Sequence, residues 1–155
     1  GLEVRVVGTP GHTADSLSFV MPAERAVLTG DTVLGRGTTV VAHPDGELGA
    51  YLGSLGRLHA LAEAQEVATI WPGHGPVIDD ALGAIGYYQD HRRERLEQVQ
   101  AAVETLRAAP HPEGIAVDEL PRRVVEIVYA DVDPVLWGAA ELSVRAQLAY
   151  LAERR

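Results

Sequence analysis

Three short stretches decide the fold prediction: TPGHT at residues 9–13, LTGDT at residues 28–32 and IWPGHG at residues 70–75. Each stretch places one polar side chain (His12, Asp31 or His74) in a glycine-containing turn that follows an apolar run. These runs have the composition of short strands. Because a sheet holds its strand ends rigidly, and glycine lets the backbone turn closely, such side chains can converge on one point.

Imidazole and carboxylate groups give the three turns a shared chemistry. Both are ligands that suit zinc, manganese or iron(II), and the two oxygens of an aspartate can bridge two ions. Taken singly, each residue has a plainer explanation, as a hydrogen-bonded turn histidine or an aspartate that caps a turn. Together and in this order, His12, Asp31 and His74 favour a metal site.

The composition limits the other possibilities. The chain has 155 residues and no cysteine, so disulfides and thiolate zinc sites are excluded. Residues 1–90 hold four arginines against eleven acidic residues, a balance that suits cations better than nucleic acid phosphates. No apolar run approaches the roughly 20 residues that span a bilayer, so we expect a cytoplasmic protein without membrane contact. Because the chain begins with Gly1 and enters a strand pattern at once, we expect a fragment or a processed product.

The order of expected elements predicts an α/β layered domain followed by a helical module. Runs at residues 17–21 and 26–29 predict a hairpin, and leucines at three- or four-residue steps predict a helix over residues 48–64. A longer helix is expected from a cap at Asp79 or Asp80 to about Ala108. We expect the first domain to cover residues 1–109 and the helical module, with helices over 117–129 and from Asp133 onward, to cover residues 110–155.

The motifs TPGHT, LTGDT and WPGHG, in this order, resemble the second half of the metallo-β-lactamase superfamily. The resemblance implies the C-terminal half of an αββα sandwich with a binuclear zinc site, manganese or iron being the alternative metals. It implies that His12 binds one ion, that Asp31 bridges, and that His74 binds the other. In such a site a water between the ions attacks the substrate, because their charge lowers its pKa.

A finer resemblance extends to the rest of the chain. GDTVLGRGTTVVAHPDGELGAYLGSLGRL, PGHGPVI and YYQDHRRERLEQV are similar to a β-lactamase-like group that includes mitochondrial endoribonucleases. That group carries a winged-helix-like module, which residues 115–155 resemble. The chain departs from that module at Ala116, where the group has a threonine cap, and in how little follows the last helix.

One departure concerns the first metal motif of the superfamily, His-x-His-x-Asp-His, which this chain lacks. The resemblance places that motif and the general base in a missing N-terminal half. We therefore expect weak or no metal binding and no turnover by the isolated chain; sub-micromolar zinc affinity by calorimetry would contradict this. We also expect uncovered apolar faces, which favour a homo-oligomer or association with the missing half.

The remaining histidines and the arginines have two interpretations each. His43 either faces the substrate or, in the plainer interpretation, is an exposed loop residue. His91 either faces the substrate or, in the plainer interpretation, is a packed residue of its helix. His59 is expected on the solvent side of its helix. His111 completes no metal motif. Five arginines either form a phosphate-contacting patch or belong to a solvated helix face. The acidic residues between them favour the solvated face. These arginines are Arg92, Arg93, Arg95, Arg122 and Arg123.

These observations support a metal-dependent hydrolase that cleaves an ester, a thioester or a phosphodiester. The substrate hypotheses are a small acyl or thioester compound and, from the finer resemblance, single-stranded RNA. The alternative is a non-catalytic binding module with a vestigial metal site, which the loss of the upstream metal motif would favour.

Overall fold

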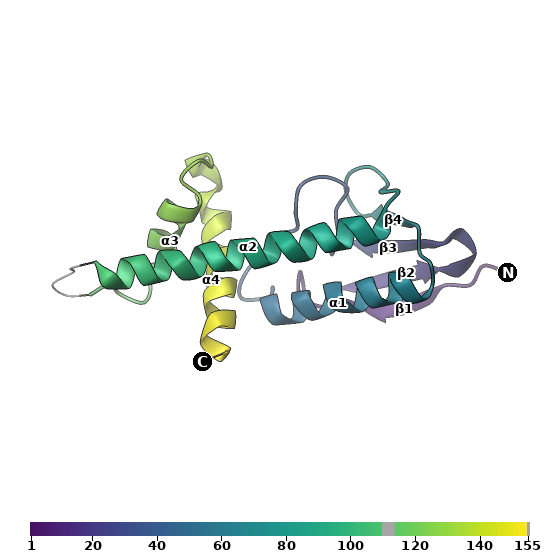
Figure 1. The fold of residues 1–155 in the computed structure, drawn as a ribbon, viewed down its shortest axis with the longest axis horizontal. Coiled ribbons are helices and arrows are strands. Elements are labelled where there is room, and N and C mark those ends of the chain that lie inside the picture. The colour runs from purple at the N-terminus through teal and green to yellow at the C-terminus, as the bar shows by residue number, and fades with distance from the viewer. Residues whose placement is uncertain (110–113, 155) are drawn as a thin grey trace.

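The structure is a computed structural model that describes residues 1–109 and 114–154 (Figure 1). It contains a four-stranded sheet with two helices against it and a smaller group of helices at the far end of the longest one. The elements in chain order are β1 (Arg5–Gly8), β2 (Leu17–Met21), the 3-10 turn η1 (Pro22–Glu24), β3 (Ala26–Gly30), α1 (Leu48–Ala64), β4 (Thr69–Pro72), α2 (Ala81–Ala108), α3 (Leu120–Val128), the 3-10 turn η2 (Pro134–Leu136) and α4 (Trp137–Glu153).

The sheet has the order β1-β2-β3-β4. The first three strands are antiparallel neighbours, and β4 returns parallel to β3 after the α1 crossover. Along β2, Ser18 and Val20 are buried while Leu17 and Phe19 are exposed, as the alternation of side chains along a strand requires. The sheet therefore has one face against the helices and one apolar face in solvent.

Helix α1 and the first turns of α2 pack against the inner face of the sheet (Figure 1). The Glu47 carboxylate caps α1 by accepting hydrogen bonds from the amides of Gly49 and Ala50, both at 2.7 Å. The α1 residues Leu48, Leu55 and Leu58 are buried, as the leucine pattern predicts. Leu55 and Leu58 pack with Val20, Val27, Ile70, Ile85 and other apolar side chains in a first core.

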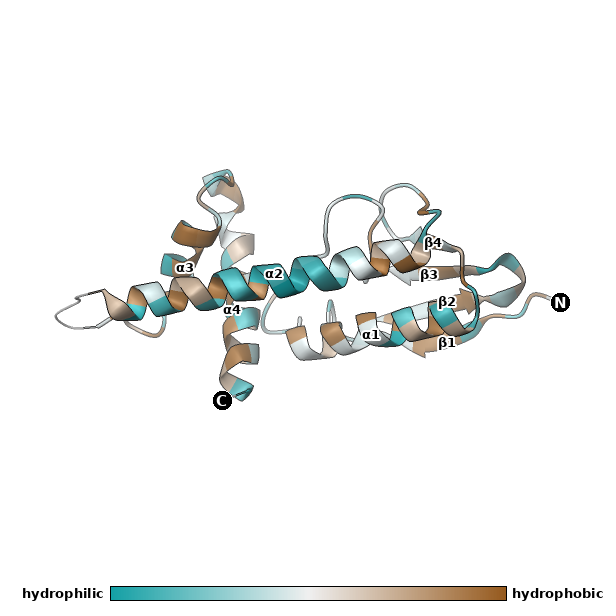
Figure 2. Cartoon of the chain, viewed as in Figure 1, coloured by the Kyte–Doolittle hydropathy of each residue, from teal (hydrophilic) through white to brown (hydrophobic). Residues whose placement is uncertain are grey.

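Helix α2 joins two hydrophobic cores. Asp80 caps its start, accepting from the amide of Gly83 at 2.9 Å, and its first turns pack in the first core. Its later residues Val99 and Val103 pack with α3 and α4 in a second core, around Val124 and Val144. Figure 2 shows a hydrophilic middle of α2 between apolar segments, the pattern that such a bridging helix needs.

The helical module also touches the first domain directly. Ala146 of α4 is buried in the first core, and the Leu142 carbonyl of the same helix accepts a hydrogen bond from the amide of His43 at 3.3 Å. The domain boundary expected at residues 109 and 110 stays a prediction. It falls at the end of α2, where residues 110–113, and with them His111, lie outside the described residues.

Two expected boundaries differ from the structure. Helix α3 begins at Leu120 rather than Val117, because Pro121 fits the first turn of a helix but not its interior. The last helix begins at Trp137, after Asp133 has capped the 3-10 turn η2 by accepting from the Val135 amide at 3.0 Å. Among the described residues, no helix has the length and apolar character needed to cross a membrane.

Candidate metal centre

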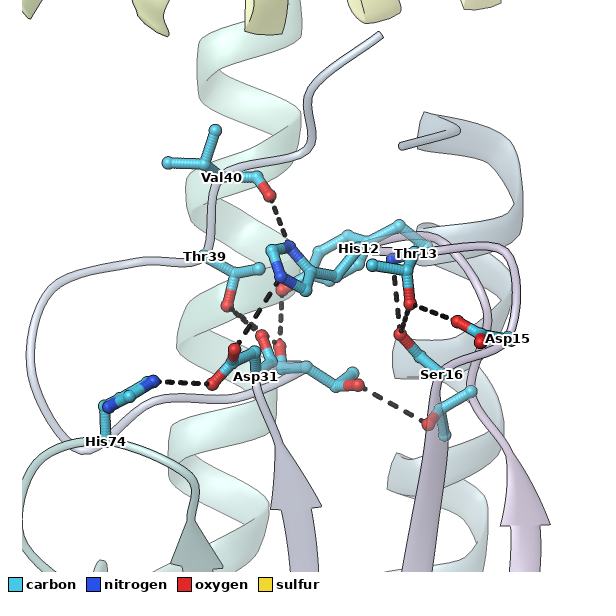
Figure 3. A network of polar contacts seen from close by, with 11 residues as sticks. His12, Thr13, Asp15, Ser16, Asp31, Thr39, Val40 and His74 are labelled. Atoms are coloured by element: carbon cyan, nitrogen blue, oxygen red, sulfur yellow. Dashed lines mark hydrogen bonds and ion pairs between the residues drawn. The ribbon is translucent and has the colours of Figure 1, made fainter. Parts of the chain in front are cut away.

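Three turns at one edge of the sheet bring together the three side chains expected to bind metal (Figure 3). His12 lies in the turn after β1, Asp31 directly after β3, and His74 in the turn after β4. The His74 Nε2 atom lies 3.4 Å from Asp31 Oδ1, and the His12 Nε2 atom lies 3.8 Å from Asp31 Oδ2. Residues sixty-two positions apart in the chain thus meet around one carboxylate.

The backbone between these turns is closely packed. The amide of Gly73 donates to the carbonyl of Gly30 at 2.8 Å, which joins the turn of His74 to the turn of Asp31. A Cβ atom at Gly73 would lie 2.8 Å from Asp31 Oδ1. Glycine at this position therefore leaves room for the carboxylate to face both histidines.

The ring of His12 is held in one orientation and one tautomer. Its Nδ1 atom lies 2.7 Å from the carbonyl oxygen of Val40. Because a carbonyl oxygen can only accept, Nδ1 carries a proton, and the Nε2 atom faces Asp31. Metal-ligating histidines commonly donate their second ring N–H to a backbone carbonyl in this way.

The Asp31 turn is supported from the core by hydroxyl groups. The Thr39 hydroxyl donates to the Asp31 carbonyl at 2.7 Å, and the Tyr51 hydroxyl donates to the Thr32 carbonyl at 2.6 Å. Burial raises the pKa of Tyr51 above its ordinary value of 10.0. The phenol therefore stays protonated, as a donor to a carbonyl must be.

The donor set fits divalent ions. An unprotonated imidazole nitrogen and a carboxylate oxygen are both acceptors, so a cation between them removes their repulsion. The three side chains are accessible from solvent: 31% of His12, 41% of Asp31 and 76% of His74 is exposed.

The same geometry leaves the site incomplete on this chain. Each histidine approaches a different oxygen of Asp31, so an ion on either side would find two of the four ligands usual for zinc. Across residues 1–109 and 114–154, no three or more His, Cys, Asp or Glu side chains close into a metal-binding group. The arrangement suits a bridging aspartate whose ions take further ligands from elsewhere.

The other candidate histidines have different surroundings. His43 is exposed on its loop, and His59 is half-buried on α1. His91 is half-buried on α2, and burial, followed by the charges of Arg92 and Arg95, lowers its pKa. In the part of the chain that the structure describes, the histidines within ion-pair distance of Asp31 are His12 and His74. The two interpretations of His43 and of His91 stay predictions, and His59 is less exposed than expected.

The arginine interpretations are both wrong for Arg92. This side chain is buried with 8% exposure, so it belongs neither to a solvated face nor to a phosphate-contacting patch. Arg93 pairs with Asp90 at 2.8 Å, and Arg95 lies over the ring of Tyr129. On α3, Arg122 and Arg123 both pair with Glu126.

The supporting roles of four residues around the site were not predicted from the sequence: Thr39, Val40, Tyr51 and Arg92. Val40 acts through its backbone carbonyl, which any residue could supply. Tyr51 could have been found, since it lies one step from the leucine pattern and carries a polar group into a buried helix face. The hydrogen bond from its hydroxyl to the Thr32 carbonyl could not have been predicted, because Thr32 is distant in the sequence.

Comparison with known proteins identifies the family. Residues 1–111 match the family profile described as "Metallo-beta-lactamase superfamily", and residues 121–155 match "Beta-lactamase associated winged helix domain". The chain is 35% identical over 151 residues to "Beta-lactamase-like protein 2 homolog" of Drosophila melanogaster, covering 97% of this chain and 46% of that protein. It is 38% identical over 133 residues to "Atrochrysone carboxyl ACP thioesterase" of Aspergillus chevalieri, covering 85% of this chain and 41% of that protein.

Solved structures give the same result. A metallo-beta-lactamase family protein from Thermus thermophilus superposes with a TM-score of 0.73 at 25% identity, covering 99% of this chain and 45% of that one. A beta-lactamase domain protein from Burkholderia ambifaria gives a TM-score of 0.74 at 25% identity, covering 97% and 43%. The chain spans about half the length of the curated relatives it matches.

These matches confirm both the fold class and the C-terminal module that the sequence predicts. Superfamily members are hydrolase-type proteins that generally bind divalent metals such as zinc or iron. The chain belongs to the metallo-β-lactamase superfamily and carries the winged helix domain associated with it.

Proposed function

We propose that His12, Asp31 and His74 are metal ligands of a hydrolase that cleaves acyl thioesters or esters. The observation that carries this proposal is the pair of distances from the two Nε2 atoms to the two oxygens of Asp31, 3.8 and 3.4 Å. Divalent ions held there supply a polarised substrate carbonyl and a water nucleophile at neutral pH. Zinc is the first choice of metal, with manganese and iron as alternatives.

The residues of this chain have distinct roles in that proposal. Asp31 would offer one oxygen to each of two ions, and His12 and His74 would each supply one further ligand. The Val40 carbonyl accepts from Nδ1 of His12, so in the neutral ring the lone pair on Nε2 is the one directed at the site. Further ligands and a general base would have to come from groups other than these three side chains.

The substrate class rests on two observations. The relative named "Atrochrysone carboxyl ACP thioesterase" is aligned with 85% of this chain. The acids around the first domain, and the pairing of Arg93, Arg122 and Arg123 with neighbouring carboxylates, disfavour a long polyanion. A small acyl thioester therefore fits better than single-stranded RNA.

A thiol-release assay tests the proposed function on the complete protein with added zinc. Hydrolysis of an acyl thioester should be detected by a thiol reagent, and Asp31→Ala should abolish it. Asp79→Ala is the matched control, because Asp79 is an exposed acid between the His74 turn and α2. Asp79→Ala should retain full activity.

Other outcomes point to the alternatives. Cleavage of a labelled oligoribonucleotide without thioester hydrolysis would replace the proposed substrate with RNA. A folded protein that binds no zinc or manganese and cleaves neither substrate would support a non-catalytic binding module.

We also propose that, in the isolated chain, the outer face of the sheet packs against a second copy of the chain. Val6 stands opposite Phe19 in the pairing of β1 with β2, and Leu17 lies on the same face. These three side chains are exposed by 61%, 38% and 49%, an apolar group that a partner surface would shield from water. Light scattering on the isolated chain should show self-association, which Phe19→Glu should reduce.

A further inference from the structure

Arg92 is a buried cation beside the metal centre. Its side chain comes from the middle of α2, and 8% of the residue is exposed. One guanidinium nitrogen donates to the carbonyl of Thr39, and the guanidinium lies 5.0 Å from the centre of the Tyr51 ring. Among the described residues, no carboxylate forms an ion pair with it and its Nε atom has no hydrogen-bond partner. Burying a cation costs free energy, so this contact needs an explanation beyond packing.

The backbone that Arg92 contacts also contacts two of the proposed ligands. The Thr39 hydroxyl donates to the Asp31 carbonyl at 2.7 Å. The Val40 carbonyl, one residue further along, accepts from His12 Nδ1 at 2.7 Å (Figure 3). The position of residues 39 and 40 therefore decides how the His12 ring is oriented and which of its nitrogens is protonated.

This segment has no regular structure to hold it in place. Residues 38–42 belong to neither a helix nor a strand. The segment is held instead by side-chain contacts: Arg92 of α2 donates to the Thr39 carbonyl, the Thr39 hydroxyl donates to the Asp31 carbonyl, and Val41 is buried in the first core. Of these contacts, that of Arg92 is made to a main-chain carbonyl next to the one that accepts from His12.

We propose that Arg92 is a positioning residue for the metal centre. By fixing the Thr39 carbonyl, it holds the Val40 carbonyl against His12 Nδ1 and so keeps the Nε2 lone pair directed at Asp31. The consequence for metal affinity rests on the proposed function. The consequence for the His12 ring does not, because the contact to Val40 exists without any ion.

A purely structural role for Arg92 makes a different prediction. If the guanidinium only fills space over Tyr51, its replacement lowers stability and leaves the His12 tautomer as it is. If it positions the segment, the tautomer changes in a protein that is still folded.

The tautomer can be measured directly on this chain. Two-bond proton–nitrogen spectra of the 15N-labelled protein at about pH 8.5, well above the ordinary imidazole pKa of about 6.5, distinguish the two neutral tautomers. Comparison with His12→Gln identifies the His12 signals. The wild type should show protonated Nδ1, and Arg92→Met should show a mixture of tautomers or mainly protonated Nε2.

Two further variants control the experiment. Arg93→Met removes the adjacent, exposed arginine and should leave the His12 spectrum unchanged. Arg92→Lys retains the buried positive charge but lacks the planar donor geometry, and it also serves if Arg92→Met fails to fold. A His12 spectrum identical to wild type in a folded Arg92→Met, or in a folded Arg92→Lys when the methionine variant does not fold, would overturn the proposal.

Zinc affinity of the complete protein, measured by competition with a chromophoric chelator, separates this proposal from the proposed function. Arg92→Met should bind zinc about 10- to 100-fold more weakly, the usual loss when the partner of a ligating histidine is disturbed. Wild-type and variant protein that bind zinc equally would overturn the positioning role and leave the metal site standing. A wild type that binds no zinc but shows the tautomer change would overturn the proposed function and leave the positioning role standing.

Discussion

The hydroxyl of Tyr51 lies 2.6 Å from the carbonyl oxygen of Thr32, the residue that follows Asp31. Tyr51 is fully buried in the first core, so this hydrogen bond ties the centre of the domain to the turn that carries the proposed bridging ligand. The Gly11 backbone packs directly against Tyr51 as well, which connects the same side chain to the turn of His12. One aromatic residue of α1 thus supports two of the three turns.

Replacing this phenol should lower stability without unfolding the protein. Tyr51→Phe keeps the ring and removes the donor, which leaves the Thr32 carbonyl with the longer 3.2 Å contact from the Thr39 hydroxyl. We expect the free energy of unfolding in urea to fall by about 1 kcal/mol, the lower end for a buried acceptor that loses one partner. Tyr87→Phe, at an exposed tyrosine on α2, is the matched control and should change it by less than about half as much. Equal effects of the two substitutions would contradict the role of the Tyr51 hydroxyl.

The contact between the loop after Asp31 and the loop after His74 should be sensitive to a single methyl group. The amide of Gly35 donates to the His74 carbonyl at 2.9 Å, and a Cβ atom at Gly35 would overlap the backbone of Pro76. Gly35→Ala should therefore separate the two loops and lower the free energy of unfolding by about 1–3 kcal/mol. Gly8→Ala is the control, since a Cβ atom there meets nothing within 4 Å. A Gly35→Ala protein as stable as wild type would show that the loops are not packed as described.

The loss of thermal stability at acidic pH should depend in part on His91. Burial, with the nearby charges of Arg92 and Arg95, lowers its pKa from the ordinary 6.5, so the folded protein favours the neutral ring. This group contributes stability that is present above pH 6.5 and lost as the pH falls through its lowered pKa. The midpoint of thermal unfolding of His91→Gln should therefore fall less than that of wild type between pH 7.5 and 5.5. Parallel pH profiles would contradict the lowered pKa.

Most of the fold follows from periodicity and turn residues. The hairpin of β2 and β3, the leucine face of α1 and the Asp80 cap are predicted from the sequence and confirmed by the structure. Asp133 is a cap as predicted, but of the 3-10 turn η2 rather than of the last helix. These features depend on residues close together in the chain, which is why the sequence reveals them.

The three turns of the candidate site could also be predicted, because each carries its own motif. The contacts that hold these turns in place could not be predicted. Arg92 lies in the charged run DHRRER, where an arginine normally faces solvent, and its partner is a backbone carbonyl 53 positions earlier. Val40 likewise acts through its backbone. A contact between a side chain and a distant main-chain group leaves no pattern in the sequence, so only the fold reveals it.

In the proposed site one carboxylate, that of Asp31, is shared between two metal ions. Anomalous diffraction at the zinc edge, from crystals of the complete protein grown with zinc, locates those ions. We expect one zinc peak at about 2 Å from an Asp31 oxygen and His12 Nε2, and a second near the other oxygen and His74 Nε2. Zinc bound elsewhere in the protein, with these three side chains free of it, would rule out Asp31 as a shared ligand.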